Sequence, residues 1–414
     1  MLTMRGLTTL AFILFLFSYL FSEYAVAQSV TENPNAPFEL KNGDRVLFLG
    51  NSLFENDLQY GYLELALTTR WPDRNVTYRN IGWSGDNVFG EARSYVTNPP
   101  TPYELLIQQI TNAKPTVVFL GYGGIEAQEG ESGLAHFKRG LNQLLDKIDQ
   151  LGAKTILISP VPVLLPPSDN VTQRNAMLET YASAIAQTAS ERKKRYVDVF
   201  KPILDVSKRA VITENGIHLN ETGYYYLATT LEKALGLAPR NGDITIDVAK
   251  NAVESTVPAN LLPVDKANTD IHFVINEPYL PLPSPEQDGK SILVDNGRKL
   301  MIKGLKKGFY SLTVDDDEVI TASANQWGEG VNIRQGPAFT HSAEMRQLIQ
   351  KKNELFFFQY RPLNQTYIIG FRSYEQGRHK KGLEEQSFII TWLEGQIAAL
   401  NQPKSATYHL TQLK

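Results

Sequence analysis

The sequence predicts an α/β protein, in which a three-layer α/β/α domain with a parallel sheet is followed by a small antiparallel β region and C-terminal helices. Two observations support this fold class. Up to residue 238, short apolar runs alternate with longer amphipathic ones, which is typical of a parallel sheet covered by helices on both faces. Beyond residue 238 the apolar segments are short and alternating, with Pro- or Gly-rich turns between them, as in antiparallel sheets.

Residues 1–27 are expected to form a cleaved secretory signal. Arg5 precedes an apolar run over residues 10–21, and Ala25 and Ala27 form a small-x-small cleavage site before Gln28. An uncleaved anchor is the alternative, although the run is short for a membrane span. We therefore expect an exported protein, periplasmic or secreted, without a stable membrane span after cleavage, and a linker over residues 28–43.

The predicted α/β domain covers residues 44–238. Apolar runs bounded by Gly, Pro or Asn are its predicted strands, at 45–49, 76–81, 116–120, 155–159 and 196–199. The stretches between and after them are its predicted helices, at 60–70, 103–113, 133–151, 174–195 and 221–235. Ligands on such sheets bind beyond the carboxyl ends of the strands, which is where Ser52 would lie.

The remainder is expected to form a small β-rich domain over residues 239–324 and a helical, aromatic extension over residues 325–414. Strands are predicted at 244–248, 271–275, 291–294, 299–302, 310–314 and 318–322, with three aspartates at the hairpin tip 315–317. Helices are predicted at 338–353 and 386–400. The aromatic segment 356–362 between these helices would dock onto the α/β domain or form a wall of a substrate cleft.

The composition excludes several chemistries. The chain has 414 residues, 42% of them apolar, a formal net charge of −3 and no cysteine. Thiolate metal sites and cysteine nucleophiles are therefore impossible, and the charge does not favour nucleic acid or membrane surfaces. No zinc-protease, EF-hand or nucleotide-binding motif occurs. We expect no cofactor, no metal site and no nucleic-acid partner.

Two motifs indicate a serine esterase. Gly50-Asn51-Ser52-Leu53 directly follows the first predicted strand, and Asn215-Gly216-Ile217-His218 lies on a much later loop. A serine hydroxyl is too weakly acidic to attack an ester unaided, so a histidine must accept its proton. We expect Ser52 to be the nucleophile and His218 the base. Taken separately, Ser52 could be only a helix cap and His218 only a loop residue.

Two further segments complete a resemblance. Gly82-Trp83-Ser84-Gly85-Asp86-Asn87 follows the second predicted strand, and Gly121-Tyr122-Gly123-Gly124 follows the third. Together with the first two motifs, these segments resemble, in order and strand context, the four sequence blocks of the SGNH (GDSL) hydrolases over residues 44–237. The resemblance implies a flavodoxin-like SGNH domain. The whole chain, including residues 353–357 and 361–367, further resembles an exported bacterial subgroup with a C-terminal β-plus-helix extension.

The resemblance also implies an oxyanion hole, in which one donor is altered here. The backbone amides of Ser52 and Gly85 would be two donors, and the family's third donor is an asparagine side chain at the position of Gly123. The amide of Gly123 or Gly124, or the side chain of Asn87, would have to replace that donor.

The acid partner of the histidine is altered as well. Asn215 stands where the family has aspartate, so His218 would work in a Ser-His dyad or in a weakened triad. Glu214 is the first candidate for a substitute acid, and Asp86 and Glu126 are the other nearby acids.

The aromatic residues of the second and third blocks have two interpretations. Trp83 and Tyr122 are expected to be half-buried packing residues, or alternatively to stack on a sugar ring of the substrate.

The expected function is that of an exported serine esterase that removes acyl groups, with acetyl as the expected group, from a carbohydrate or small-molecule ester. The alternative is a non-catalytic glycan-binding or scaffold protein on a degenerate SGNH fold, which the altered positions Asn215 and Gly123 motivate.

Overall fold

The computed structural model describes residues 36–93, 100–240, 242–263, 269–287, 290–291, 298–361 and 380–413. The predicted secretory signal lies outside this part of the chain, and so does most of the strand predicted at 291–294. Among the helices that the structure describes, none has the length and apolar character needed to cross a membrane.

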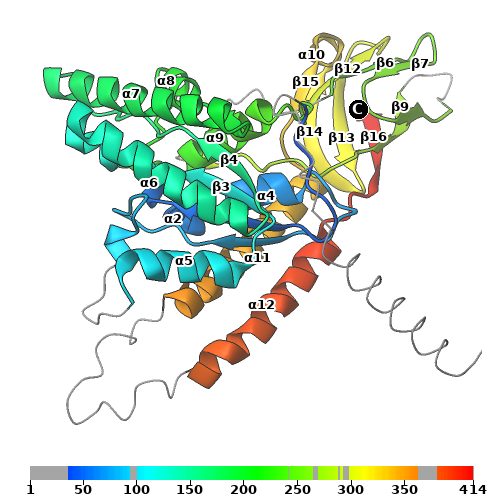
Figure 1. Cartoon of the computed structure of the whole chain (residues 1–414). Coiled ribbons are helices and arrows are strands. Elements are labelled where there is room, and N and C mark those ends of the chain that lie inside the picture. The colour runs from blue at the N-terminus through cyan, green and yellow to red at the C-terminus, as the bar shows by residue number, and fades with distance from the viewer. Residues whose placement is uncertain are drawn as a thin grey trace, which may run out of the picture. The chain divides into compact units, whose positions relative to one another are not determined.

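A parallel five-stranded sheet organises the first domain (Figure 1). Its strands are β1 (Arg45–Gly50), β2 (Thr77–Asn80), β3 (Val117–Gly121), β4 (Lys154–Ile158) and β5 (Arg195–Val197). They are ordered β2-β1-β3-β4-β5, and every neighbouring pair is parallel. The predicted fold class is thus confirmed, and this order is the flavodoxin-like one. Its topological switch point, where ligands bind in such sheets, lies between β1 and β3.

Apolar side chains of the sheet enter two cores, one on each face. In β1, Val46 and Phe48 belong to one core and Leu47 and Leu49 to the other, because successive side chains of a strand point to opposite faces. Helices of the first core are α2 (Ser52–Glu55), α3 (Asp57–Tyr60), α4 (Tyr62–Thr68), α8 (Phe200–Ser207) and α9 (Glu221–Ala234). Helices of the second are α5 (Pro102–Ala113), α6 (Gly130–Gln150) and α7 (Asp169–Glu191).

Two of the predicted helices differ from those observed. The helix predicted at 60–70 is divided, because Gly61 adopts a left-handed conformation with φ of 69° between α3 and α4. The helix predicted at 174–195 begins earlier, since the Ser168 hydroxyl accepts a hydrogen bond from the Val171 amide and caps α7.

The β-rich part contains two larger sheets and is not purely antiparallel. One sheet has the order β15-β12-β6-β7 and the other β14-β13-β16-β9-β8. Their strands are β6 (Ile244–Asp247), β7 (Ala252–Ser255), β8 (Ala259–Leu261), β9 (Asp270–Asn276), β12 (Arg298–Lys303), β13 (Phe309–Val314), β14 (Asp317–Ser323), β15 (Val331–Ile333) and β16 (Ser405–Gln412). The prediction of antiparallel pairing is wrong for β6 and β12, which pair in parallel.

The last strand corrects the predicted helical extension. β16 lies between β9 and β13 and pairs antiparallel with both, so residues predicted to follow the helices of the extension complete a sheet instead. The hairpin tip at 315–317 is confirmed: Asp315 and Asp316, between β13 and β14, adopt positive φ of 49° and 74°.

Helix α11 (Pro337–Tyr360) connects the C-terminal part to the α/β domain, and α12 (Lys380–Leu400) packs beside it. Lys352 of α11 forms a buried ion pair with Glu64 of α4, with Nζ and Oε1 2.5 Å apart. Residues 356–360 of the predicted aromatic segment form the end of α11, because the helix continues to Tyr360, whose hydroxyl donates to the Gly82 carbonyl at 3.0 Å. These contacts agree with the docking interpretation of the segment.

Candidate active site

A cavity of about 120 Å³ opens at the switch point of the parallel sheet. Three strands contribute the residues that follow them: Asn51 and Ser52 after β1, Tyr122 and Gly124 after β3, and Pro160 after β4. The other lining residues are mostly apolar, and they are Leu53, Gly121, Ile125, Ala127, Gln128, Ser159, Val161, Pro162, Val163, Arg174, Leu178 and Ile217.

Ser52 lies at the first position of helix α2. Asn51 is the N-cap residue, and its Oδ1 accepts a hydrogen bond from the Leu53 amide at 3.1 Å. Gly50 must be a glycine, because a Cβ atom there would lie 2.3 Å from the Gly121 carbonyl oxygen. Ser52 is partly exposed, and neither its hydroxyl nor its backbone N–H has a hydrogen-bond partner among the described residues.

The His218 loop borders the same cavity through Ile217. The Glu214 amide donates to the His218 carbonyl at 3.0 Å, and the Leu164 amide donates to the Gly216 carbonyl at 2.7 Å, so the loop is held against the segment that follows β4. Within the described part of the chain, no hydrogen bond joins Ser52 Oγ to the His218 ring. The structure therefore brings the two predicted loops to one cavity without pairing their side chains.

Asn215 contacts the imidazole directly. Its Oδ1 accepts from the backbone amides of Ile217 at 3.0 Å and His218 at 2.9 Å, which fixes the orientation of the side-chain amide. Its Nδ2 therefore faces His218 Nδ1, at 3.3 Å. An amide N–H can only donate, so Nδ1 must be the acceptor and the proton of a neutral ring is on Nε2. A general base needs the opposite tautomer, with Nε2 free to accept the serine proton.

The candidate substitute acids are engaged elsewhere. Glu214 accepts a hydrogen bond from the Tyr60 hydroxyl at 2.7 Å. Asp86 is fully buried against Arg93, with its Oδ2 2.8 Å from Nε. Glu126 accepts from the amides of Val88 at 3.0 Å and Gly123 at 2.8 Å, and its burial raises its pKa to about 7. None of these contacts orients the His218 ring.

The predicted oxyanion donors separate into two groups. Gly85 is exposed with φ of 79°, and its N–H has no partner in the described structure, so it remains available together with the N–H of Ser52. Gly123 is unsuitable, because its N–H is bound by Glu126 and a Cβ atom there would point at Ile185 Cδ1, 3.0 Å away in the core. Asn87 is unsuitable too: its Nδ2 donates to Glu91 Oε2 at 2.6 Å.

Trp83 and Tyr122 are buried rather than half-buried, at 4% and 2% exposure, which removes the ring face that sugar stacking requires. The Tyr122 hydroxyl donates to Asp86 Oδ2 at 2.8 Å. The Trp83 ring has the guanidinium carbons of Arg93 and Arg361 at 5.1 and 3.6 Å from its centroid. These aromatic residues and their charged partners fix the loops that follow β2 and β3.

Arg174 of α7 is a site residue that the sequence did not reveal. It lines the cavity together with Ser52, is half-buried, and forms no ion pair with any residue that the structure describes. Its position depends on how α7 packs, and no local motif marks it.

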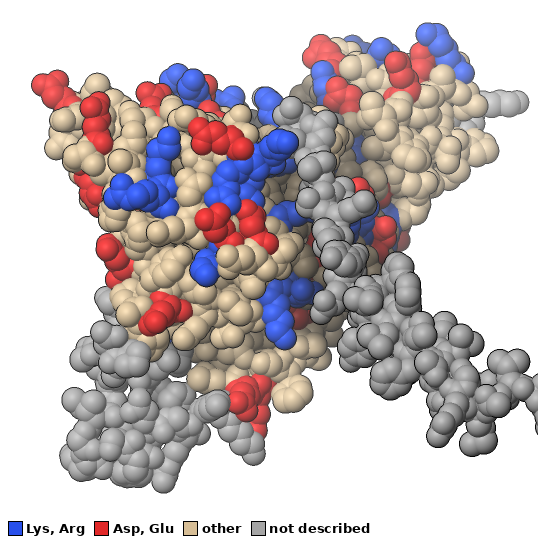
Figure 2. All heavy atoms as spheres, in the orientation of Figure 1, with Lys and Arg blue, Asp and Glu red and all other residues tan. Residues whose placement is uncertain are grey.

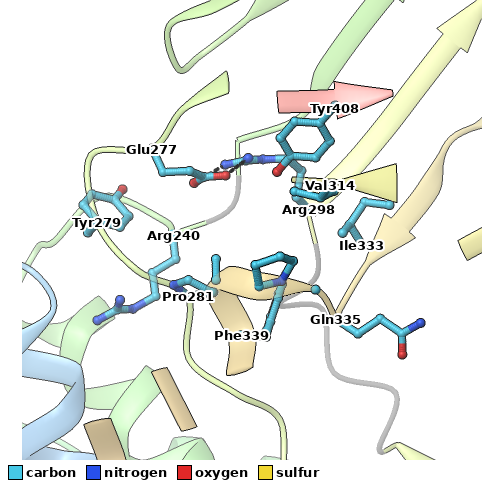
Figure 3. A pocket seen from close by; sticks show the side chains of 13 residues that line it. Arg240, Glu277, Tyr279, Pro281, Arg298, Val314, Ile333, Gln335, Phe339 and Tyr408 are labelled. Atoms are coloured by element: carbon cyan, nitrogen blue, oxygen red, sulfur yellow. Dashed lines mark hydrogen bonds and ion pairs between the residues drawn. The ribbon is translucent and has the colours of Figure 1, made fainter. Parts of the chain in front are cut away.

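Two other features of the described structure do not have the arrangement of a reaction site. The cavity in Figure 3 measures only about 40 Å³, and the ion pair of Arg298 with Glu277 occupies its wall. Arg240, which also lines it, forms an ion pair with Glu232. On the face seen in Figure 2, Lys and Arg side chains lie among Asp and Glu side chains, so that face has no extended surface of one charge.

Comparison with known proteins finds a family match within the α/β domain. The family model of GDSL-like lipases and acylhydrolases matches residues 48–226. No curated protein matches the sequence significantly. Among solved structures, BT4096, described as a gut microbial diltiazem-metabolizing enzyme, is similar over 91% of this chain and 99% of its own, with 17% identity and a TM-score of 0.69. Axe2, an acetylxylan esterase from Geobacillus stearothermophilus, is similar over 49% of this chain and 98% of its own, with 18% identity and a TM-score of 0.39.

Proposed function

Residues 48–226 of this chain belong to the GDSL-like lipase/acylhydrolase family, and on that premise we propose that the protein is an esterase that hydrolyses short acyl esters at Ser52. The observation that carries the proposal is the placement of Ser52. It begins a helix at the switch point of the sheet, lines a largely apolar cavity, and its own amide has no hydrogen-bond partner among the described residues. The amide of Gly85, which the family resemblance gives as the second donor, has no such partner either.

The size of the cavity favours a short acyl group. Its volume of about 120 Å³ is smaller than the roughly 150 Å³ apolar cavity that holds a benzene molecule. An acetyl or similarly small group fits entirely within such a space, whereas a long acyl chain would extend out of it. We therefore place the acyl group in the cavity and the alcohol part of the ester, a saccharide or another small molecule, at its mouth.

In this mechanism His218 first changes to the tautomer with its proton on Nδ1, which breaks the hydrogen bond from Asn215. The Ser52 hydroxyl then attacks the ester carbonyl carbon, and its proton passes to Nε2 of His218. The carbonyl oxygen becomes an oxyanion, which the amides of Ser52 and Gly85 stabilise. The alcohol leaves with the proton from His218, and water then releases the acyl group from Ser52 by the same steps.

Asn51 is our candidate for the third oxyanion donor. Its Oδ1 is held by the Leu53 amide, so its Nδ2 is the free end of the side chain. Nδ2 would lie 3.5 Å from a Cβ atom at Gly124, and both residues line the cavity. Because Gly124 has no side chain, it leaves space beside Asn51 Nδ2. The side-chain amide of Asn51 can therefore act as the oxyanion donor that the family takes from an asparagine after β3. Asn51→Asp keeps the acceptor for Leu53 but removes the donor, and should lower kcat by about 10²- to 10³-fold.

Arg174 supports a preference for anionic substrates. A cation without an ion-pair partner at the cavity wall is best satisfied by a negatively charged group on the ester. We propose that this group belongs to the alcohol part, since the acyl part occupies the apolar cavity. The predicted signal at residues 1–27 supports action outside the cytoplasm.

Asn215 supports a second candidate function, a non-catalytic ester- or glycan-binding protein. With Nδ1 of His218 accepting from Asn215, the resting imidazole presents a proton and not a lone pair at Nε2, so turnover in this site would be slow.

One assay separates these candidates. Purified protein is tested against p-nitrophenyl acetate and acetylated xylan, beside Ser52→Ala and the matched control Ser132→Ala, which changes an exposed serine of α6. The esterase proposal expects hydrolysis by wild type and Ser132→Ala and its loss in Ser52→Ala. Equal rates in wild type and Ser52→Ala would contradict it and leave the binding function.

A further inference from the structure

We propose that the outer face of the β-rich part binds a divalent transition metal ion, Zn²⁺ by preference, through Asp270, His272 and His409. This site lies outside the Ser52 cavity and does not depend on the proposed esterase function. It was not expected from the sequence, because its residues do not form a local motif.

The pairing of β9 with β16 brings these residues together. His272 lies directly opposite His409 in the antiparallel register, and Asp270 lies opposite Thr411. Asp270 and His272 are two residues apart on one strand, so they point to the same face of the sheet. That face is the outer one, because the alternate residues Ile271 and Phe273 are fully buried. One ligand atom from each of the three side chains lies within 4.8 Å of the others.

The two imidazoles converge on one carboxylate. Their rings are stacked, with centroids 4.0 Å apart and planes inclined by 11°. His272 Nε2 lies 3.5 Å from Asp270 Oδ2, and His409 Nε2 contacts the other carboxylate oxygen, Oδ1. Thr411 Oγ1 lies 2.8 Å from His409 Nε2. The corresponding nitrogen of each ring therefore faces its own oxygen of the same acid.

The arrangement brings three donors that one metal ion can share into a small volume. Two imidazole nitrogens and one carboxylate oxygen lie within 4.8 Å of one another on neighbouring strands. The register neighbours Thr313 and Thr411 on the same face are uncharged, and Asp270 is the described acid that contacts both rings. A divalent cation can take a lone pair from both rings and from Asp270 at once.

The donor set determines which ion fits. Two imidazole nitrogens and one carboxylate oxygen suit Zn²⁺, which keeps water in the fourth position of such three-ligand sites. Ca²⁺ and Mg²⁺ prefer oxygen ligands and should bind poorly. The three side chains are 36% to 49% exposed, so the ion can enter from solvent and the ligands can close on it by side-chain rotation.

Such an ion would link β16 to β9. Asp270 and His409 are 139 residues apart in the sequence, and a ligand that binds only the folded arrangement stabilises it by mass action. We therefore expect Zn²⁺ to raise the midpoint of thermal unfolding and EDTA to reverse that shift.

The test is isothermal titration calorimetry of the metal-free full chain with ZnCl₂, and with CaCl₂ as a second probe. Wild type should bind one Zn²⁺, and binding should weaken by at least about tenfold in His409→Ala and in Asp270→Asn, a change that keeps the size of the side chain. The matched control His136→Ala, which removes a histidine outside the cluster, should bind as wild type. Equal Zn²⁺ affinity in wild type, His409→Ala and Asp270→Asn, or no binding by wild type, would overturn the proposal. Ser52-dependent hydrolysis should be the same with and without Zn²⁺, so the two proposals can fail separately.

Discussion

Replacing Asn215 with aspartate tests the chemistry of the proposed active site most directly. The carboxylate can accept the same two hydrogen bonds from the amides of Ile217 and His218 that the side-chain oxygen now accepts. Its second oxygen would replace Nδ2, 3.3 Å from His218 Nδ1. An oxygen there accepts a hydrogen bond where the amide donates one, so the ring changes to the tautomer that leaves Nε2 free for the proton of Ser52.

The expected gain follows from this geometry. At a separation of 3.3 Å, a carboxylate and an imidazolium attract each other by about 1 kcal/mol with a dielectric constant of 80 and about 5 kcal/mol with one of 20. Asn215 is exposed and His218 partly so, which places the attraction in the lower part of that range. The change to the correct tautomer adds to the gain from this attraction, because replacing aspartate by asparagine in an intact triad costs about 10⁴-fold in kcat. We expect kcat to rise by about 10²- to 10⁴-fold.

The measurement is steady-state hydrolysis of p-nitrophenyl acetate by wild type, Asn215→Asp and the double variant Ser52→Ala/Asn215→Asp. The gain should appear in kcat with little change in KM, because Asn215 acts through His218 and not on the substrate. The double variant should be inactive. If wild type already shows Ser52-dependent hydrolysis and Asn215→Asp has the same kcat, the tautomer of His218 does not limit the reaction and the reasoning is wrong.

Three further predictions concern other residues. Arg174→Gln should raise KM by about 10- to 100-fold for acetyl esters whose alcohol part carries a carboxylate, and leave p-nitrophenyl acetate unaffected; equal effects on both esters would exclude charge recognition. Burial raises the pKa of Glu126 from 4.5 to about 7, so the folded protein keeps a proton that the unfolded chain loses, and the free energy of unfolding should fall as pH rises through that interval. In urea denaturation, the free energy of unfolding of Glu126→Gln should fall over that pH interval by about 3 kcal/mol less than that of wild type. The same pH dependence in Glu126→Gln and wild type would show that Glu126 titrates normally. Lys352→Met should destabilise the fold by about 3 to 5 kcal/mol because Glu64 is left buried and unpaired, and adding Glu64→Gln should restore most of this; a double variant as unstable as Lys352→Met would contradict the pairing.

The parallel sheet could be predicted because its signal is local. The central strands β1, β3 and β4 are short apolar runs between turn residues, and strands buried on both faces show that pattern without knowledge of their partners. The position of Ser52 could be predicted from that of β1, because a residue directly after a strand of a parallel sheet lies at the carboxyl edge of the sheet whatever the details of packing.

The remaining features depend on contacts between distant residues. In β16 only Tyr408 and Leu410 are buried apolar residues, so its alternation is too short to mark a strand. Gly123 matches the family's asparagine position by spacing, but its φ of 101° turns a side chain at that position toward the core. The orientation of Asn215 depends on two backbone amides of its loop, which no sequence pattern specifies.

The position of β16 also has a consequence for how the chain reaches its native state. The Thr407 amide donates to the Asp315 side chain 92 residues earlier, and β16 pairs with β9 on one side and with β13 on the other. Until residues 405–412 leave the ribosome, β9 and β13 each expose an edge without a strand partner. Such an edge can form hydrogen bonds with a strand of another chain, which leads to aggregation. Chaperone binding would then have to protect these edges, and a product truncated before residue 405 should accumulate as aggregates even though the α/β domain is already complete.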